Sequence, residues 1–101
     1  MQMVVVVFRG SLESEVLKVL AKSGVHAYTD LPHVVGVGKS GARLDSFERP
    51  GFNALIFTVL EDQDAQRLVD RLREFRDRAA ARQHGAEIPL RAFMLPCIQV
   101  I

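Results

Sequence analysis

The segment with the clearest chemical character is the glycine-rich run Gly36-Val-Gly-Lys-Ser40. A phosphate-binding P-loop has the pattern G-x-x-x-x-G-K-[ST], and His33 stands where its first glycine belongs. A P-loop also needs a following helix whose N-terminus meets the phosphate, whereas a loop and another strand-like run follow here. We therefore expect no true P-loop. Two interpretations stay open: a flexible polar loop, or a looser anion site of backbone N–H groups and cations. The candidate residues of that site are Gly36, Gly38, Lys39, Ser40, Gly41 and Arg43.

Three histidines and one cysteine are the other candidates for ligand chemistry, namely His26, His33, His84 and Cys97. They lack the local spacing that metal sites usually show. His26 and His33 lie on either side of Pro32, and these two are the candidate ligands for a metal ion, on one chain or across a subunit boundary. The alternative is that each is a surface histidine. Because Cys97 is the single cysteine, an intramolecular disulfide is excluded.

Catalytic chemistry has little support in the sequence. No Ser-His-Asp or Cys-His spacing indicates a nucleophile, and no pair of carboxylates stands out, so we expect a protein that is not an enzyme. Arginines are frequent between residues 67 and 78, but aspartates and glutamates alternate with them. That mixture predicts a solvated helix face, and we expect no nucleic-acid partner.

The bulk composition is that of an ordinary globular chain. Its 101 residues are enough for one domain, which we expect to span residues 1–101. The net charge of +1 gives no general attraction to nucleic acid or anionic membranes. The longest apolar runs, Val4 to Phe8 and Ala54 to Leu60, are too short to cross a bilayer. The first residues lack the basic region of a secretory signal, so we expect a cytoplasmic protein without direct membrane insertion.

Hydrophobic periodicity predicts four strands and two helices in the order β-α-β-β-α-β. The first helix is expected to have Ser11 as its N-cap and to end near Gly24, and the second to have Asp62 or Asp64 as its N-cap. Pro32 predicts an edge strand or a bulge. The four predicted strands are Met3 to Phe8, Val25 to Leu31 with a continuation over Val34 to Val37, Ala54 to Leu60, and Leu90 to Leu95. A short fifth strand over Ile98 to Ile101 is an additional option.

This order favours an α+β, ferredoxin-like fold, in which two helices cover one face of an antiparallel sheet and the first and third strands are central. Val4, Val6 and Phe8 alternate with residues that are also apolar, Met3, Val5 and Val7. One layer of helices covers only one of these two sets. We therefore expect a neighbouring subunit to cover the other set, which predicts an oligomer.

The chain resembles the PII signalling superfamily, in particular its small PII-like branch, over nearly its whole length. Gly24 to Thr29 is similar to the family's passage from the first helix into the second strand. Val35 to Lys39 resembles the G-x-G-[RK] that opens the family's T-loop, and residues 39–51 would form a short version of that loop. Leu60 to Asp62 and Ala92 to Pro96 resemble the start of the second helix and the fourth strand.

The resemblance implies a homotrimer whose sheets face inward, with ligand sites in the clefts between subunits. In nucleotide-binding members, the ligand contacts positions that correspond here to Thr29, Gly36, Gly38, Lys39 and Arg91. The glycine-rich phosphate loop of those members is missing, because residues 83–89 contain one glycine, Gly85. The resemblance therefore favours a small anion or an adenine mononucleotide over a triphosphate.

The functional hypothesis is a non-enzymatic PII-like regulator. A nucleotide or small anion would order the loop, and the loop would then dock on a membrane transporter or another target protein. The alternative is a metal-binding protein related to metal tolerance or efflux, with a divalent metal held by His26, His33 or Cys97 at a subunit boundary.

Overall fold

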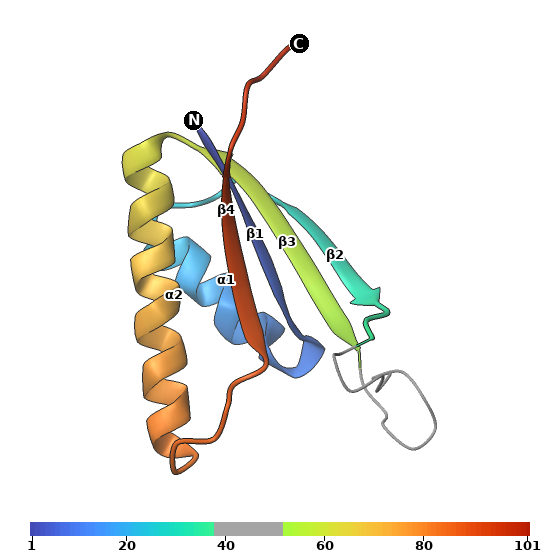
Figure 1. The fold of residues 1–101 in the computed structure, drawn as a ribbon, viewed down its shortest axis with the longest axis vertical. Helices are drawn as coiled ribbons and strands as arrows, with labels where there is room; N and C mark the ends of the chain where they lie inside the picture. The colour runs from blue at the N-terminus through green and yellow to red at the C-terminus, as the bar shows by residue number, and fades with distance from the viewer. Residues whose placement is uncertain (38–51) are drawn as a thin grey trace.

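The computed structural model describes residues 1–37 and 52–101 and confirms the predicted β-α-β-β-α-β order (Figure 1). The segment 39–51, which we predicted to be a short loop, lies outside the described residues. The elements, in chain order, are β1 (Gln2–Arg9), the 3-10 turn η1 (Gly10–Leu12), α1 (Glu13–Lys22), β2 (Thr29–Val34), β3 (Asn53–Leu60), α2 (Asp62–Arg82) and β4 (Leu90–Pro96).

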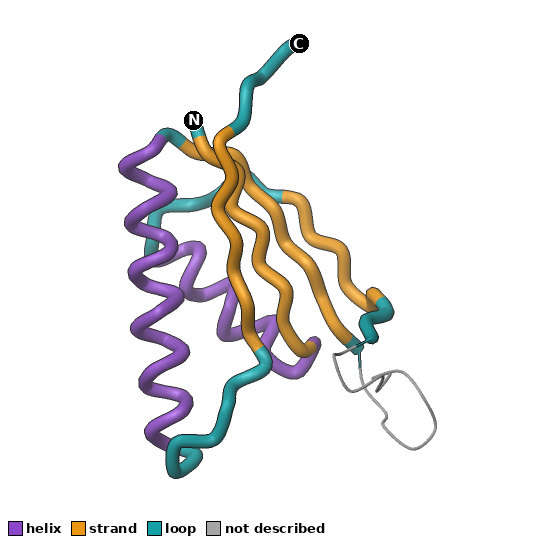
Figure 2. Tube along the Cα trace, in the orientation of Figure 1, coloured by secondary structure: helices purple, strands orange, loops and turns teal. Residues whose placement is uncertain are grey.

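The four strands form one antiparallel sheet in the order β2-β3-β1-β4. The prediction that the first and third strands are central is confirmed, and so is the ferredoxin-like fold. Val5 of β1 lies opposite Phe57 of β3 on one side and opposite Phe93 of β4 on the other. Both helices cover the same face of this sheet (Figure 2). The strands β2 and β4 are its two edges.

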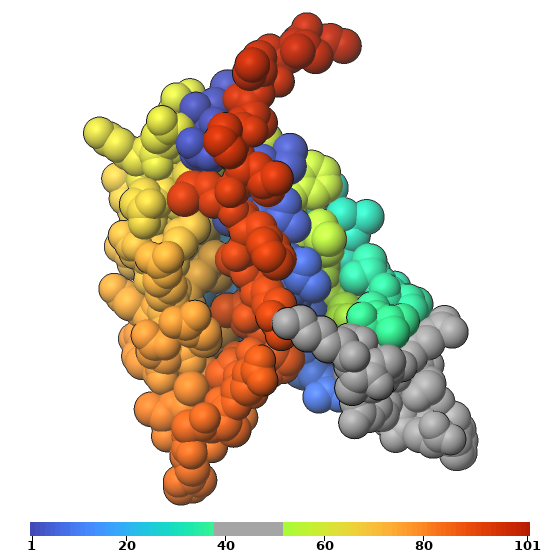
Figure 3. Space-filling model, in the orientation of Figure 1, coloured from blue at the N-terminus to red at the C-terminus, as the bar shows by residue number. Residues whose placement is uncertain are grey.

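The sheet face that the helices do not cover is apolar, as the pattern of β1 predicted. Residues that are directly paired in an antiparallel sheet point to the same face. On the uncovered face, Phe93 and Leu95 of β4 are 55% and 47% exposed, and Figure 3 shows the side chains of β4 standing out on the molecular surface. We call this surface the open face. It is formed by Met3, Val5, Val7, Leu31, Leu55, Phe57, Val59, Phe93 and Leu95, with Thr29, Arg91, Arg9 and Asn53 as polar members.

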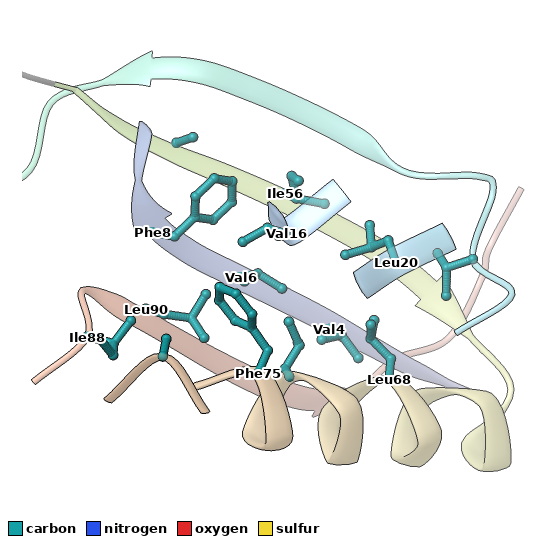
Figure 4. Packing of buried hydrophobic residues seen from close by; sticks show 14 of the residues in the cluster. Val4, Val6, Phe8, Val16, Leu20, Ile56, Leu68, Phe75, Ile88 and Leu90 are labelled. Atoms are coloured by element: carbon teal, nitrogen blue, oxygen red, sulfur yellow. The ribbon is translucent and has the colours of Figure 1, made fainter. Parts of the chain in front are cut away.

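The hydrophobic core lies between the opposite face of the sheet and the two helices (Figure 4). Val4, Val6 and Phe8 of β1 point into it and are almost completely buried. They pack beneath residues that recur at helical spacing, which is why both helices are amphipathic. The helical contribution comes from Val16 and Leu20 of α1 and from Ala65, Leu68, Leu72, Phe75 and Ala79 of α2.

The expected N-cap at Ser11 is wrong. The chain leaves β1 through η1, and α1 begins only at Glu13, with Leu12 as its N-cap and no capping side chain. The N–H of Gly10 donates a hydrogen bond of 2.6 Å to the carbonyl of Phe52. This contact with a distant segment fixes the exit from β1, so the helix starts later than the sequence predicted.

The capping residue of the second helix also differs from the expectation. Its N-cap is Glu61, which makes no side-chain capping bond, and Asp62 and Asp64 lie in the first turn. There they favour the helix through its dipole rather than by capping. Asp62 instead accepts a hydrogen bond of 2.9 Å from the α-amino group of Met1.

The second strand begins later than predicted, and the short fifth strand is wrong. β2 starts at Thr29 rather than Val25, because Val25 turns into the core and is only 3% exposed. The interpretation of Pro32 as an edge or bulge position is confirmed, since the register shifts between Leu31 and Val34. Residues 98–101 follow β4 without strand structure. Within the described ranges, neither helix combines the length and the apolar character needed to span a membrane.

Truncation of a core residue of α2 tests the packing of the helices on the sheet. The side chain of Leu68 is fully buried. We expect Leu68→Ala to lower the free energy of unfolding by about 2–5 kcal/mol, through lost burial and the cavity left behind. Urea titration followed by circular dichroism measures this change. Val35→Ala, at an exposed position, should stay within about 0.5 kcal/mol of wild type; equal losses in both variants would contradict the described core.

The contact between Met1 and Asp62 predicts a pH dependence of stability. The hydrogen bond from the Met1 amine holds the pKa of Asp62 below its usual 3.8, and the same bond raises the pKa of the amine above 8.0. The carboxylate therefore stabilises the fold above about pH 4, and this contribution is lost as the pH falls through its lowered pKa. The contribution of the amine is full below about pH 8 and is lost as the pH rises through its raised pKa.

We therefore expect Asp62→Asn to unfold at a lower urea concentration than wild type between about pH 4 and pH 8, with the difference shrinking at both ends. The difference should be small, because the carboxylate is largely exposed to solvent. Acetylation of the α-amino group should have the same effect in wild type and no effect in Asp62→Asn. A difference that does not change with pH would exclude this ion pair as its cause.

Candidate functional site

Contacts between distant segments surround the point where β2 ends and β3 begins, at one end of the sheet. The rings of His33 and Phe52 meet edge to face, with 4.3 Å between their centroids and an angle of 83° between their planes. The backbone of His33 has a φ of 60°, a left-handed conformation that is uncommon for a residue with a side chain. The Gly10 N–H also binds the carbonyl of Phe52, as described above. We call the surroundings of His33, Gly36, Phe52 and Asn53 the loop base.

Among the residues of the predicted anion site, Gly36 lies within the described part of the chain. A Cβ atom at this position would collide with the side-chain amide nitrogen of Asn53. Asn53 pairs with Val34 in the sheet. A larger residue at position 36 would therefore push aside the flexible end of the Asn53 side chain, because the chain leaving β2 passes close to the start of β3. The other members of the predicted anion site, Gly38, Lys39, Ser40, Gly41 and Arg43, lie outside the described residues, and that site stays a prediction.

Thr29 and Arg91 both lie on the open face, at its opposite edges. Thr29 is in β2 opposite Phe57, and Arg91 is in β4 opposite Val7. Both side chains are exposed. Because three strand spacings of about 4.8 Å separate β2 from β4, the two residues are roughly 14 Å apart across one sheet. One subunit therefore does not bring them together.

The guanidinium group of Arg91 is 3.6 Å from Glu87 Oε1. Both side chains are mostly exposed, so this ion pair is weak and Arg91 can exchange its partner for a ligand. Glu87 belongs to the turn between α2 and β4, in which His84 and Gly85 adopt left-handed backbone conformations.

The two histidines predicted as metal ligands are far apart within one chain. His26 lies in the connection before β2, and His33 lies near the other end of that strand. Seven residues of mostly extended chain correspond to about 20 Å, so the two cannot share an ion within one subunit. Residues 1–37 and 52–101 contain no group of three or more His, Cys, Asp or Glu side chains arranged around a metal. A metal site between subunits stays an untested prediction.

Sequence reasoning missed a groove between α2 and β4, which has a volume of about 420 Å³. Figure 3 shows this hollow between the two elements. Arg73, Arg76 and Arg91 line it, together with the apolar side chains of Leu72 and Ile88. The spacing of Arg73 and Arg76 on one helix was the available signal, but the sequence did not show that Arg91 lies beside them. Aspartates and Glu87 pair with these three arginines, so the groove carries little net charge.

A second missed feature is Asp30 in the edge strand β2. It lies opposite Ile56, so its side chain points toward the helical layer. Its Oδ1 atom is buried and has no hydrogen-bond partner in the part of the chain that the structure describes. A buried acceptor without a partner has a free-energy cost.

The fold and the loop base define a ferredoxin-like protein in which β2 ends and β3 begins at the same end of the antiparallel sheet. The sequence matches the family described as nitrogen regulatory protein P-II over residues 1–100. The chain therefore belongs to the P-II family, as the sequence resemblance indicated. No curated protein matches the chain in sequence.

Solved structures of PII-like proteins share the fold. CPII from Thiomonas intermedia K12, a nitrogen regulatory PII-like protein bound to ADP, AMP and bicarbonate, is 13% identical with a TM-score of 0.62, and the match covers 93% of this chain and 84% of that one. Its apo form gives 14% identity, a TM-score of 0.64 and coverages of 93% and 85%. A PII-like signalling protein from Thermus thermophilus is 22% identical with a TM-score of 0.62, covering 93% and 83% of the two chains.

Proposed function

We propose that this P-II family member is a non-enzymatic regulator that binds an adenine nucleotide or a small anion between the subunits of a homotrimer. The observation that carries the proposal is the position of Thr29 and Arg91. They are exposed polar residues of a mostly apolar open face, and they lie at its opposite edges. When open faces of neighbouring subunits pack together, the β2 edge of one sheet meets the β4 edge of the next. A site that contains both residues is then completed between subunits.

The open face supplies the driving force for that assembly. Its apolar side chains come from all four strands, and on a single subunit they remain in contact with water. Burial of apolar surface is worth roughly 25 cal/mol per Å², so assembly that covers this face is favourable. Three copies around a common axis give each open face two neighbours and form a closed assembly.

The ligand in this proposal is small and anionic. Arg91 offers a guanidinium group that suits phosphate or carboxylate oxygens, and Thr29 offers a hydroxyl group. Gly36, Gly38, Lys39, Ser40, Gly41 and Arg43 would add N–H groups and charge from the loop. The turn before β4 has a single glycine, Gly85, and therefore lacks a glycine-rich loop for a triphosphate. For this reason we favour AMP, ADP or bicarbonate over ATP. The Thiomonas protein supports this choice, since its structure holds ADP, AMP and bicarbonate.

The proposed output is protein docking by the segment that begins at the loop base. Ligand contacts at Gly36 would restrict the chain as it leaves β2, where Asn53 and the His33–Phe52 pair already hold it. The ordered loop would then bind a target, for which we propose a membrane transporter or another partner protein. We propose no metal function, because no cluster of side chains in residues 1–37 and 52–101 favours one.

The trimer is tested by placing a charge on the open face. Phe93→Glu introduces a carboxylate opposite Val5, where neighbouring sheets would pack. We expect wild type to have the mass of a trimer in light scattering and the variant to dissociate with its helical circular dichroism unchanged, because a charge is costly to bury in an apolar interface. Arg67→Glu, on the helical layer, should remain trimeric. A monomeric wild type would refute the assembly and the site that depends on it.

The ligand site is tested by calorimetry with AMP, ADP, ATP and bicarbonate. We expect Arg91→Ala to weaken binding about 10–100-fold, the loss typical of a hydrogen bond to a charged group. Thr29→Val, which removes only the hydroxyl group, should weaken it less. Arg67→Ala is the matched control, because Arg67 is exposed and pairs with Asp64 on the helical layer. Absence of heat with all four ligands, or identical affinities for wild type and Arg91→Ala, would count against the proposal.

A further inference from the structure

A separate groove of about 230 Å³ lies between α1 and α2, and the proposed ligand function does not use it. Val19 and the buried Phe75 form its apolar floor. Two carboxylates, Glu15 and Glu74, also line it. Five cationic side chains form its rims, and we call the whole feature the interhelical groove. These cations are Lys18 and Lys22 of α1 and Arg71, Arg78 and Arg82 of α2.

Positive charge is concentrated in this groove. Five cations and two carboxylates give it an excess of three positive charges (5 − 2 = 3). The whole chain has 13 lysines and arginines against 12 aspartates and glutamates. The remaining residues therefore carry a net charge of −2 (8 − 10 = −2). The excess is a local property of the two facing helices, and the overall composition does not reveal it.

The arginines of α2 divide into two groups by their partners. Arg67, Arg73 and Arg76, which lie outside the groove, each form an ion pair with an aspartate of the same helix. Among residues 1–37 and 52–101, the five groove cations form no ion pair. Arg78 Nε donates a long bond of 3.4 Å to the backbone carbonyl of Glu74. The aspartates of α2 therefore do not neutralise the groove cations, and these positive charges lie together on one surface.

The spacing of the cations fits an elongated ligand. Arg71, Arg78 and Arg82 are seven and four residues apart, so they follow one side of α2 over about 16 Å, at 1.5 Å per residue. Lys18 and Lys22 are four residues apart, so they share one side of α1. The two rows flank an apolar floor. A third helix fits the interhelical groove when it carries apolar residues on one stripe and acidic residues on both flanks.

We propose that the interhelical groove is a docking site for an acidic amphipathic helix of a partner protein. Leucine-sized side chains of that helix would contact Val19 and Phe75, and its glutamates or aspartates would pair with the two cationic rows. A nucleic-acid duplex or a lipid bilayer would contact the rims but would not fill the apolar floor. Because the helices cover the opposite side of the sheet from the open face, the groove stays accessible when that face is covered (Figure 2).

The experiment uses a fluorescein-labelled helical peptide of about three heptads, with Leu along one stripe and Glu on both flanks. Fluorescence anisotropy measures its binding to the full chain. We expect Lys22→Glu/Arg78→Glu to weaken binding at least about 10-fold, since close like charges replace attraction with repulsion. Arg67→Glu/Arg73→Glu, which changes the net charge equally outside the groove, should change binding less than about 2-fold. Binding should weaken as salt rises from about 0.05 to 0.5 M.

Three results would overturn the proposal. The first is that wild type binds the acidic peptide no better than a peptide with Lys in place of Glu. The second is that the two double variants lose binding equally, which would indicate general attraction between opposite charges. The third is stronger, groove-dependent binding of duplex DNA or of vesicles with anionic lipid. Circular dichroism establishes that both variants fold, and calorimetry with AMP distinguishes this surface from the proposed nucleotide site, because the groove variant should retain the wild-type response.

Discussion

The burial of the central strand is the constraint on which the rest of the structure depends. β1 is apolar on both faces, and it pairs with β3 and β4 at the same time. The helices cover the face that carries Val4, Val6 and Phe8, and this packing makes the subunit fold. The opposite face of the strand is left without a cover in the subunit. The proposed assembly and its ligand site both follow from this imbalance, because Thr29 and Arg91 are the polar edges of that same face.

Alternation within a strand was enough to predict the sheet. The two apolar sets of β1 indicated both its central position and an uncovered face, because each depends only on which residues neighbour one another along a strand. Element starts were harder to predict. Ser11 has the chemistry of an N-cap, yet a hydrogen bond from Gly10 to Phe52, far along the chain, fixes the exit from β1 and with it the start of α1. Val25 has the character of a strand residue but packs into the core, so β2 starts at Thr29.

The candidate sites, like the starts of the elements, depend on contacts between residues that are distant in the sequence. The close contact between position 36 and the side chain of Asn53 is visible only in the folded structure. The interhelical groove was not foreseen, because it combines lysines of α1 with arginines from a distant part of the chain. The sequence showed acidic and basic residues mixed along α2 and suggested a neutral face. In the folded subunit, the aspartates neutralise Arg67, Arg73 and Arg76, and within the described residues the arginines beside α1 have no such partners.

The chain termini lie at the same end of the sheet, and the loop base lies at the other (Figure 1). The N–H of Cys97 donates a hydrogen bond of 3.3 Å to the carbonyl of Met1, which ties the end of β4 to the start of β1. Fusion partners or surface tethers attached at either terminus would therefore project away from the loop base. The same proximity suits a circular permutation, in which a short linker joins the old termini and new ones open elsewhere, since such rearrangements are tolerated where termini are close together.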